Sequence, residues 1–357
     1  MNRKTEGADL LRALCLEFGP SGCEDRVADL IKENIEGSYD ELVPDKMGAV
    51  IALIRGNGKS DKKVMLSAHM DEIGFMVREI REDGLICFSS MMGPDTRIMA
   101  GRRVTVGMPD RLNRGVIAMK PVHTVDRGDR DKAAPVDELY IDIGASSKEE
   151  AEKYVKIGDF GTFESDFVQF GENGRLLKAK ALDDRLGCAL MIETMRKIYA
   201  NKDKLAYDVY FAFTCREELG MGGARCASHK IRPDYALVFE ATAVADIYGV
   251  PEISRVATRG EGGAVSIIDK GTIYDKELVE LVIGVAREKD IPCQIKKYVS
   301  GGNDASHIQR AADGVKCAAI SAPCGYIHTA SDVIAVSDYE AMCDLAVAVL
   351  ERIDKNA

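Results

Sequence analysis

Segments of helical periodicity alternate with short apolar runs along this chain, and this alternation restricts the folds open to it more than any other feature. Apolar residues recur at the spacing of one helix face in four segments: 10–18, 27–35, 186–199 and 278–286. Continuous apolar runs, typical of strands buried on both faces, occupy 49–54, 64–66, 207–214, 235–239 and 315–320. This order predicts an α/β/α layered domain around a mixed, mostly parallel sheet. A Ser-x-x-Glu capping box of Ser337 and Glu340 predicts that the last helix starts at Ser337.

The middle of the chain departs from this pattern. Between residues 75 and 166 helical periodicity fades and turns are frequent, and three short runs are β-like: 103–106, 115–119 and 138–143. We therefore expect a β-rich, barrel-like domain at 75–166. It would be inserted into a discontinuous layered domain formed by 1–74 and 167–357, and a length of 357 residues suffices for both.

Charge and cysteine content narrow the functional classes. Lys and Arg total 48 and Asp and Glu total 58, a net charge of −10, which argues against nucleic acid or an anionic membrane as partner and favours cations. The N-terminal residues lack the apolar core of a signal peptide, and no run approaches the roughly 20 apolar residues of a membrane span. The ten cysteines include no Cys-x-x-Cys pair, which is typical of reduced thiols in a cytoplasmic protein.

A His-x-Asp triplet, His69-Met70-Asp71, follows the apolar run at 64–66. His69 and Asp71 would point to one face if the strand continued through them. An imidazole with a carboxylate beside it suits a metal ligand and the group that orients it. Alone the triplet is a weak signal, so its value depends on partners at the ends of other strands.

Four further segments place acidic or imidazole side chains where a predicted strand ends or a helix begins: Asp183-Asp184, Glu217-Glu218, Glu240 and His328. The carboxyl ends of the strands in an open α/β sheet meet at its ligand-binding edge, where this much negative charge would repel itself without cations. Each segment has an ordinary alternative, namely a helix cap for the Asp pair, a solvated pair for the Glu pair and a surface position for His328. Their coincidence favours a metal site. The remaining histidines carry no such signal: His123, His229 and His307.

Several motifs follow one another along the chain in a specific order. They are residues 18–22 (FGPSG), 68–74 (AHMDEIG), 141–147 (IDIGASS), 180–185 (KALDDR), 217–220 (EELG), 301–305 (GGNDA) and 326–328 (YIH). In these motifs, over nearly its whole length, the chain resembles the tetrahedral, dinuclear metallo-aminopeptidases of the glutamyl and deblocking aminopeptidase type. Some proteins of this type are labelled endoglucanases.

The resemblance implies a metallopeptidase-type layered domain that holds two divalent metal ions, zinc before cobalt or manganese. It implies that His69 and Glu240 bind one ion, that Glu218 and His328 bind the other, and that Asp183 bridges the two. Mixed imidazole and carboxylate ligands suit these metals better than they suit calcium.

The resemblance also implies an activity and an assembly. Glu217 would act as the general base and Asp71 would orient His69, in an enzyme that removes N-terminal residues from short peptides. A homo-oligomer is implied as well, a dodecamer built from dimers through the inserted domain. The chain departs from the usual pattern at Glu240, where Asp is usual, and at Asn303, where Thr is usual. The first change affects a metal ligand and the second affects the rim of the site.

Three alternatives remain open. A related dinuclear amidohydrolase, such as a carboxypeptidase or deacylase, would use the same ligands without needing a free α-amine on its substrate. A glycosidase would use Glu217 and a second carboxylate as acid and base, but it leaves His69 and His328 unexplained. A binding protein would keep the fold without the chemistry.

Overall fold

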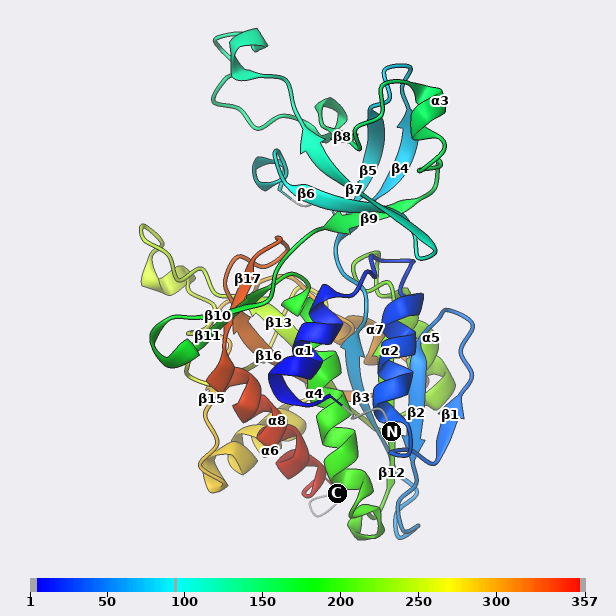
Figure 1. Ribbon diagram of the computed structural model, residues 1–357. Helices are drawn as coiled ribbons and strands as arrows, with labels where there is room; N and C mark the ends of the chain where they lie inside the picture. The colour runs from blue at the N-terminus through cyan, green and yellow to red at the C-terminus, as the bar shows by residue number, and fades with distance from the viewer. Residues whose placement is uncertain (1–4, 93–94, 354–357) are drawn as a thin grey trace.

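A layered α/β body carries a smaller closed barrel at one end (Figure 1). The computed structural model describes residues 5–92 and 95–353. Each segment predicted as a helix or strand is found, with most ends shifted by a few residues. No described helix is both long and apolar enough to span a bilayer.

The described part of the chain contains eight α-helices and seventeen strands. The helices are α1 (Gly7–Leu16), α2 (Asp25–Ile35), α3 (Lys148–Ala151), α4 (Leu182–Tyr199), α5 (Gly222–Ile231), α6 (Lys276–Glu288), α7 (Ala305–Ile308) and α8 (Val336–Leu350). The strands of the body are β1 (Glu41–Val43), β2 (Val50–Ile54), β3 (Lys63–His69), β10 (Val168–Phe170), β11 (Leu176–Ala179), β12 (Asp208–Thr214), β13 (Tyr235–Ala243), β14 (Gly263–Val265), β15 (Cys293–Ile295), β16 (Lys316–Cys324) and β17 (Asp332–Ala335). The strands of the barrel are β4 (Gly74–Ile80), β5 (Ile86–Met91), β6 (Arg103–Met108), β7 (Arg111–Ala118), β8 (Tyr140–Asp142) and β9 (Phe160–Phe163).

The main sheet is mixed and mostly parallel, as predicted. Its eight strands follow the order β1-β2-β12-β3-β13-β16-β14-β15. The four central strands β12, β3, β13 and β16 are parallel to one another, whereas β2 is antiparallel to β12, and β14 is antiparallel to β16. Helix α4 packs against β3 and β13, while α5 packs against β12 and β3 and α7 packs against β16. The carboxyl ends of the central strands therefore meet at one edge.

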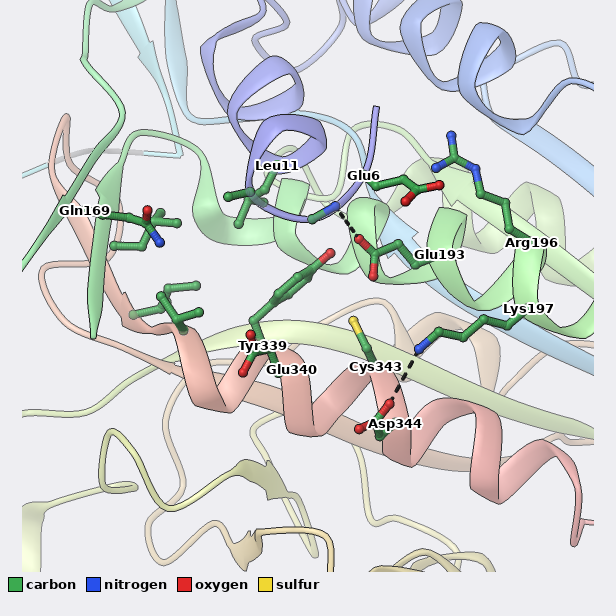
Figure 2. A pocket seen from close by; sticks show the side chains of 15 residues that line it. Glu6, Leu11, Gln169, Glu193, Arg196, Lys197, Tyr339, Glu340, Cys343 and Asp344 are labelled. Carbon is green, nitrogen blue, oxygen red and sulfur yellow. Dashed lines mark hydrogen bonds and ion pairs between the residues drawn. The ribbon is translucent and has the colours of Figure 1, made fainter. Parts of the chain in front are cut away.

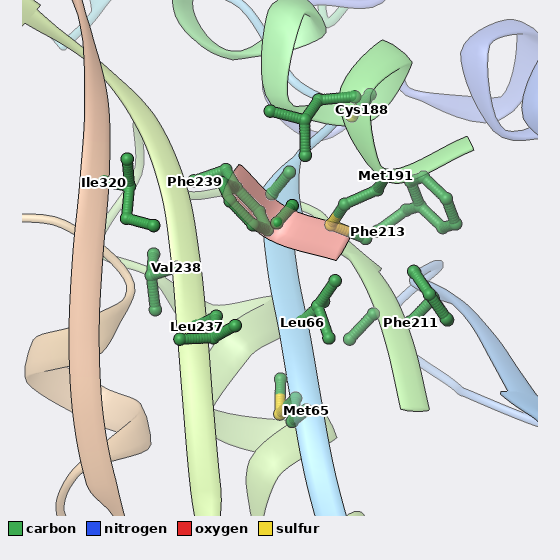
Figure 3. Packing of buried hydrophobic residues seen from close by; sticks show 14 of the residues in the cluster. Met65, Leu66, Cys188, Met191, Phe211, Phe213, Leu237, Val238, Phe239 and Ile320 are labelled. Atoms are coloured by element: carbon green, nitrogen blue, oxygen red, sulfur yellow. The ribbon is translucent and has the colours of Figure 1, made fainter. Parts of the chain in front are cut away.

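The central strands are buried on both faces, which explains why their sequences read as continuous apolar runs. Figure 3 shows Leu66 of β3, Phe213 of β12 and Phe239 of β13 packed together, with Met191 of α4 against them. Burying side chains of this size stabilises the fold by about 1.5–3 kcal/mol each. This packed core fixes the positions of the strand ends, and therefore the positions of the polar side chains that they carry.

The barrel closes in the order β4-β5-β8-β7-β6-β9 and has a core of its own. Its centre holds three aromatic rings, with the ring centroids of Phe75 and Phe88 5.1 Å apart and those of Phe75 and Phe163 6.5 Å apart. The predicted β-rich, barrel-like insert is thus a closed six-stranded barrel. The domain limits at 75–166 remain a prediction, although the barrel strands run from Gly74 to Phe163.

Two local predictions were wrong. The last helix begins at Val336, and its first turn has no side-chain cap, so Ser337 and Glu340 form no capping box. The acid at Asp338 instead accepts the backbone N–H groups of Gly260 and Gly262, at 2.8 and 2.7 Å. Strand β13 was expected to end at Phe239, but its ladder with β16 continues to Ala243, so Glu240 lies within the strand.

Candidate metal centre

The predicted site residues of five separate segments meet at one edge of the main sheet. His69 is the last residue of β3, and Thr214, at the end of the adjacent β12, is paired with it in the ladder. Glu217 and Glu218 follow β12, and Glu240 projects from β13. The parallel order of β12, β3 and β13 is what brings these segments side by side.

His69 is buried with its two ring nitrogens in different surroundings. Its Nε2 lies 3.2 Å from Oδ1 of Asp183 and 3.7 Å from Oε2 of Glu240. Its Nδ1 lies 3.1 Å from the carbonyl oxygen of Asp71 and 3.5 Å from Oδ1 of the same residue. The ring therefore offers Nε2 to the acidic cluster while Asp71 fixes its orientation.

His328 lies on the other side of Asp183. Its Nε2 is 3.1 Å from Oδ2 of Asp183 and 3.4 Å from Oε1 of Glu218. Each oxygen of the Asp183 carboxylate thus faces a different imidazole. Two triplets share this residue, and in each the ligand-type atoms lie within 4.8 Å of one another: His69, Asp183 and Glu240; and Asp183, Glu218 and His328. A third such group joins His69 to Glu217 and Glu218.

The ordinary alternatives do not describe most of these residues. Asp183 and Asp184 have non-helical backbone angles in the first turn of α4, and only Asp184 caps the helix, by accepting the N–H of Gly187 at 2.9 Å. Glu217 and Glu218 are 9% and 1% exposed, so they are not a solvated pair. His123, His229 and His307 belong to none of the described groups that could hold a metal.

The pKa values reflect crowded buried carboxylates around two imidazoles. Burial raises the pKa of Glu218 to about 7 and raises the pKa values of Glu217 and Glu240 well above their usual range. Burial alone would lower the pKa of His328, but its hydrogen bond with Asp183 and the negative charges of Glu218, Asp183 and Asp332 together outweigh burial and raise this pKa to about 10. Burial therefore disfavours the charged forms of Glu217, Glu218 and Glu240, and cations beside them would favour these forms again. Burial acts in the same way on Asp183, but its hydrogen bonds and charge interactions with His328 and His69 hold its pKa below the usual range.

The donor set fits divalent cations. Both carboxylate oxygens of Glu218 and Oε1 of Glu240 are buried without a hydrogen-bond partner. Buried carboxylate oxygens without partners are strongly unfavourable unless they coordinate an ion. Together with the two imidazoles they form a mixed nitrogen and oxygen set, which suits zinc, cobalt or manganese.

Asp71 contacts both His69 and the turn that carries Glu217 and Glu218. Its Oδ1 accepts the backbone N–H of Glu217 at 3.0 Å, and its Oδ2 accepts that of Glu218 at 3.1 Å. One buried carboxylate therefore sets the position of His69 and of the turn after β12. The hydrogen bonds described for the chain include none to the carboxylate of Glu217, which leaves that group free for proton transfer.

Two residues of the motif at 301–305 make contacts that the sequence did not indicate. Asp304 accepts a hydrogen bond from Oγ1 of Thr214 at 2.6 Å, behind the cluster. Asn303, at the position where the loop departs from the usual pattern, is buried and donates to the hydroxyl of Tyr274 at 3.0 Å, so it does not lie on an open rim. Asp304 and Asn303 stood in a recognised motif, but nothing in the sequence indicated their partners.

A pocket of about 860 Å³ lies away from this cluster, between the start of α1 and helices α4 and α8 (Figure 2). Glu193 accepts the backbone N–H of Gly7 at 2.8 Å there, and Lys197 lies 3.4 Å from Asp344. None of the predicted site residues lines it. The acidic cluster lies instead beside a narrower cleft lined by Asp183, Glu218 and His328.

Comparison with known proteins decides the family. The model of the M42 glutamyl aminopeptidase family matches residues 48–345. This chain belongs to that family. M42 members are aminopeptidases, so the chain is a hydrolase of that class, and the metal dependence of the family agrees with the acidic and imidazole cluster.

Individual M42 relatives agree over almost the full chain. The lysyl aminopeptidase of Pyrococcus furiosus is 31% identical over 97% of this chain and 97% of its own length. The TET aminopeptidase of Thaumarchaeota archaeon SCGC AB-539-E09 is 33% identical, with a TM-score of 0.93 over 98% of this chain and 96% of that one. The TET1 peptidase of Pyrococcus horikoshii, which can assemble into a tetrahedron or a large octahedral shell, is 31% identical, with a TM-score of 0.85 over 96% and 98%.

Proposed function

We propose that this M42 member is a dinuclear, metal-dependent aminopeptidase that removes N-terminal residues from short peptides. The observation that carries the proposal is the position of Asp183, whose two carboxylate oxygens lie 3.2 and 3.1 Å from Nε2 of His69 and of His328. A carboxylate shared in this way by two imidazole and carboxylate triplets suits a bridging ligand between two cations.

In this proposal Asp183 bridges two cation sites. His69 and Glu240 complete one site, and Glu218 and His328 complete the other. Zinc is the first candidate, before cobalt and manganese, because both sites combine imidazole with carboxylate. Two such cations would supply Lewis-acid polarisation of the scissile carbonyl, an acidified water and stabilisation of the developing oxyanion.

Glu217 performs the proton chemistry. Its carboxylate takes a proton from the attacking water and passes it to the amine that leaves when the peptide bond breaks. Its position depends on Asp71, whose Oδ1 accepts a hydrogen bond from the backbone N–H of Glu217 at 3.0 Å. The burial that raises its pKa makes it a stronger base, which suits this role.

The proposed assembly is supported by a relative of the chain, and the proposed location is supported by its cysteines. The P. horikoshii TET1 peptidase can assemble into a tetrahedron or a large octahedral shell, which supports a homo-oligomer here, a dodecamer built from dimers with dimer contacts through residues 75–166. All ten cysteines are free, and this supports a cytoplasmic location.

Metal analysis of the purified protein, combined with turnover of aminoacyl-arylamides, tests the proposed function. We expect two divalent ions per chain, loss of turnover with a chelator and its return on adding zinc or cobalt. Acylation of the substrate's α-amine should abolish turnover. Equal turnover of the acylated substrate would indicate a deacylase instead, and metal-independent release of reducing sugar would indicate a glycosidase.

A further inference from the structure

A second buried charged network lies beside the metal centre, at the point where the chain passes from the body into the barrel. Glu72 immediately follows Asp71, and only Ile73 separates it from the start of β4 at Gly74. Its Oε1 lies 2.5 Å from Nζ of Lys180 and 3.5 Å from Nη2 of Arg185. Its Oε2 accepts a hydrogen bond from Oγ1 of Thr162 at 2.8 Å. All four side chains are buried.

The backbone of Glu72 is held as firmly as its side chain. Its N–H donates to the carbonyl of Gly19 at 3.1 Å, and its carbonyl accepts the N–H of Ser21 at 3.1 Å. Arg185 donates to the carbonyl of Gly19 at 3.0 Å, to that of Leu14 at 2.7 Å and to that of Met70. A Cβ at Gly19 would come within 2.7 Å of this guanidinium, so the approach requires glycine.

The partners of Glu72 lie on both sides of the site and in both parts of the molecule. Thr162 belongs to β9 of the barrel, whereas Lys180 and Arg185 flank the bridging candidate Asp183 by three and two residues. Glu72 itself is covalently joined to Asp71, which orients His69. One carboxylate therefore connects the barrel with the segment that carries Asp183 and with the residue that orients His69.

We propose that Glu72 is a positioning residue of the metal centre that couples the packing of the barrel to the geometry of the two cation sites. This inference rests on the proposed dinuclear function. Glu72 belongs to none of the described groups that could hold a metal ion. It acts through Asp71 on one side and through Lys180, Arg185 and Asp183 on the other. It also offsets part of the positive charge of Lys180 and Arg185, which would otherwise oppose cation binding at the adjacent sites more strongly.

Cobalt titration of three single variants, followed by the d–d absorption spectrum, tests this proposal. Glu72→Gln removes the charge, and we expect cobalt affinity to fall by about 10- to 100-fold with an altered spectrum. Thr162→Val removes only the barrel's hydrogen bond, so it should shift affinity and spectrum in the same direction by less. In both variants kcat should fall more than KM rises, because the altered groups act on the geometry of the two cation sites.

Asp159→Asn is the matched control. Asp159 is as buried as Glu72 and pairs with Arg111 at 2.5 and 2.6 Å, entirely within the barrel region. We expect this variant to lower thermal stability while cobalt affinity and spectrum stay as in the wild type. Wild-type cobalt binding by Glu72→Gln and Thr162→Val would overturn the proposal, as would an equal loss in Asp159→Asn. A wild-type protein that binds no cobalt would instead overturn the proposed function.

Discussion

Two buried charged clusters lie within a few residues of each other, and they are balanced in opposite ways. Around Glu72, one carboxylate meets two cationic side chains and a hydroxyl, and both of its oxygens have partners. Around Asp183, carboxylates outnumber imidazoles, and buried oxygens of Glu218 and Glu240 have no hydrogen-bond partner.

The difference separates a supporting network from a binding site. A buried network in which every charged group has a partner offsets the desolvation of its charges and holds backbone segments in place. A cluster whose buried carboxylate oxygens lack partners is unfavourable until cations bind. Its presence in a well-packed core therefore indicates a function that selection has favoured over stability. Four substitutions test this difference.

The largest effect is expected at Glu217. Replacing Glu217 by Gln keeps the size of the side chain but removes the base, so kcat should fall by about 10²- to 10⁴-fold. Two bound metal ions should remain, because Glu217 is not assigned as a ligand. Steady-state kinetics and metal analysis measure both quantities. Glu340→Gln, an exposed change on α8, should match the wild type. Near-normal kcat in Glu217→Gln would remove Glu217 from the mechanism.

Removing one charge from each cluster should change stability in opposite directions. Lys180→Met leaves Glu72 with a weaker counter-charge, and we expect the free energy of unfolding to fall by about 3–5 kcal/mol. In the metal-free protein at pH 8, above the pKa of about 7 of Glu218, Glu218→Gln removes a desolvated charge. It should raise the free energy of unfolding by about 1–2 kcal/mol.

Urea unfolding of the chelator-treated proteins measures these changes. Lys120→Met is the control, since Lys120 and Glu138 form an exposed ion pair, which should contribute less than about 1 kcal/mol. Changes of the same sign in Lys180→Met and Glu218→Gln would show that the two clusters do not differ as described.

The smallest effect is expected at Glu240, where the resemblance to the family implies Asp. Glu240→Asp draws the carboxylate back from Nε2 of His69, now 3.7 Å away. A carboxylate is still present, so we expect kcat and the affinity for one of the two ions to change by about tenfold or less. Competition between zinc, cobalt and manganese measures the shift. Loss of both ions would contradict the assignment of Glu240 to a single site.

Much of the fold could be predicted because its signals are local. The runs at 64–66, 207–214 and 235–239 are continuous because those strands are buried on both faces, and the loss of helical periodicity after residue 75 marked the barrel. The start of α8 was misjudged because a capping-box sequence indicates only a tendency to begin a helix, which tertiary contacts can override. Asp338 is used instead to hold Gly260 and Gly262, which are distant in sequence.

The residue types and their order along the chain were enough to recognise the family and to predict which side chains gather at the strand ends. The contacts between these side chains depend on the tertiary fold. That Asp183 presents one oxygen to each imidazole, and that Asp71 holds the turn after β12, depends on strand order across more than 100 residues of chain. The partners of Glu72 were equally hidden, because a buried ion pair between distant segments leaves no periodic pattern in either one.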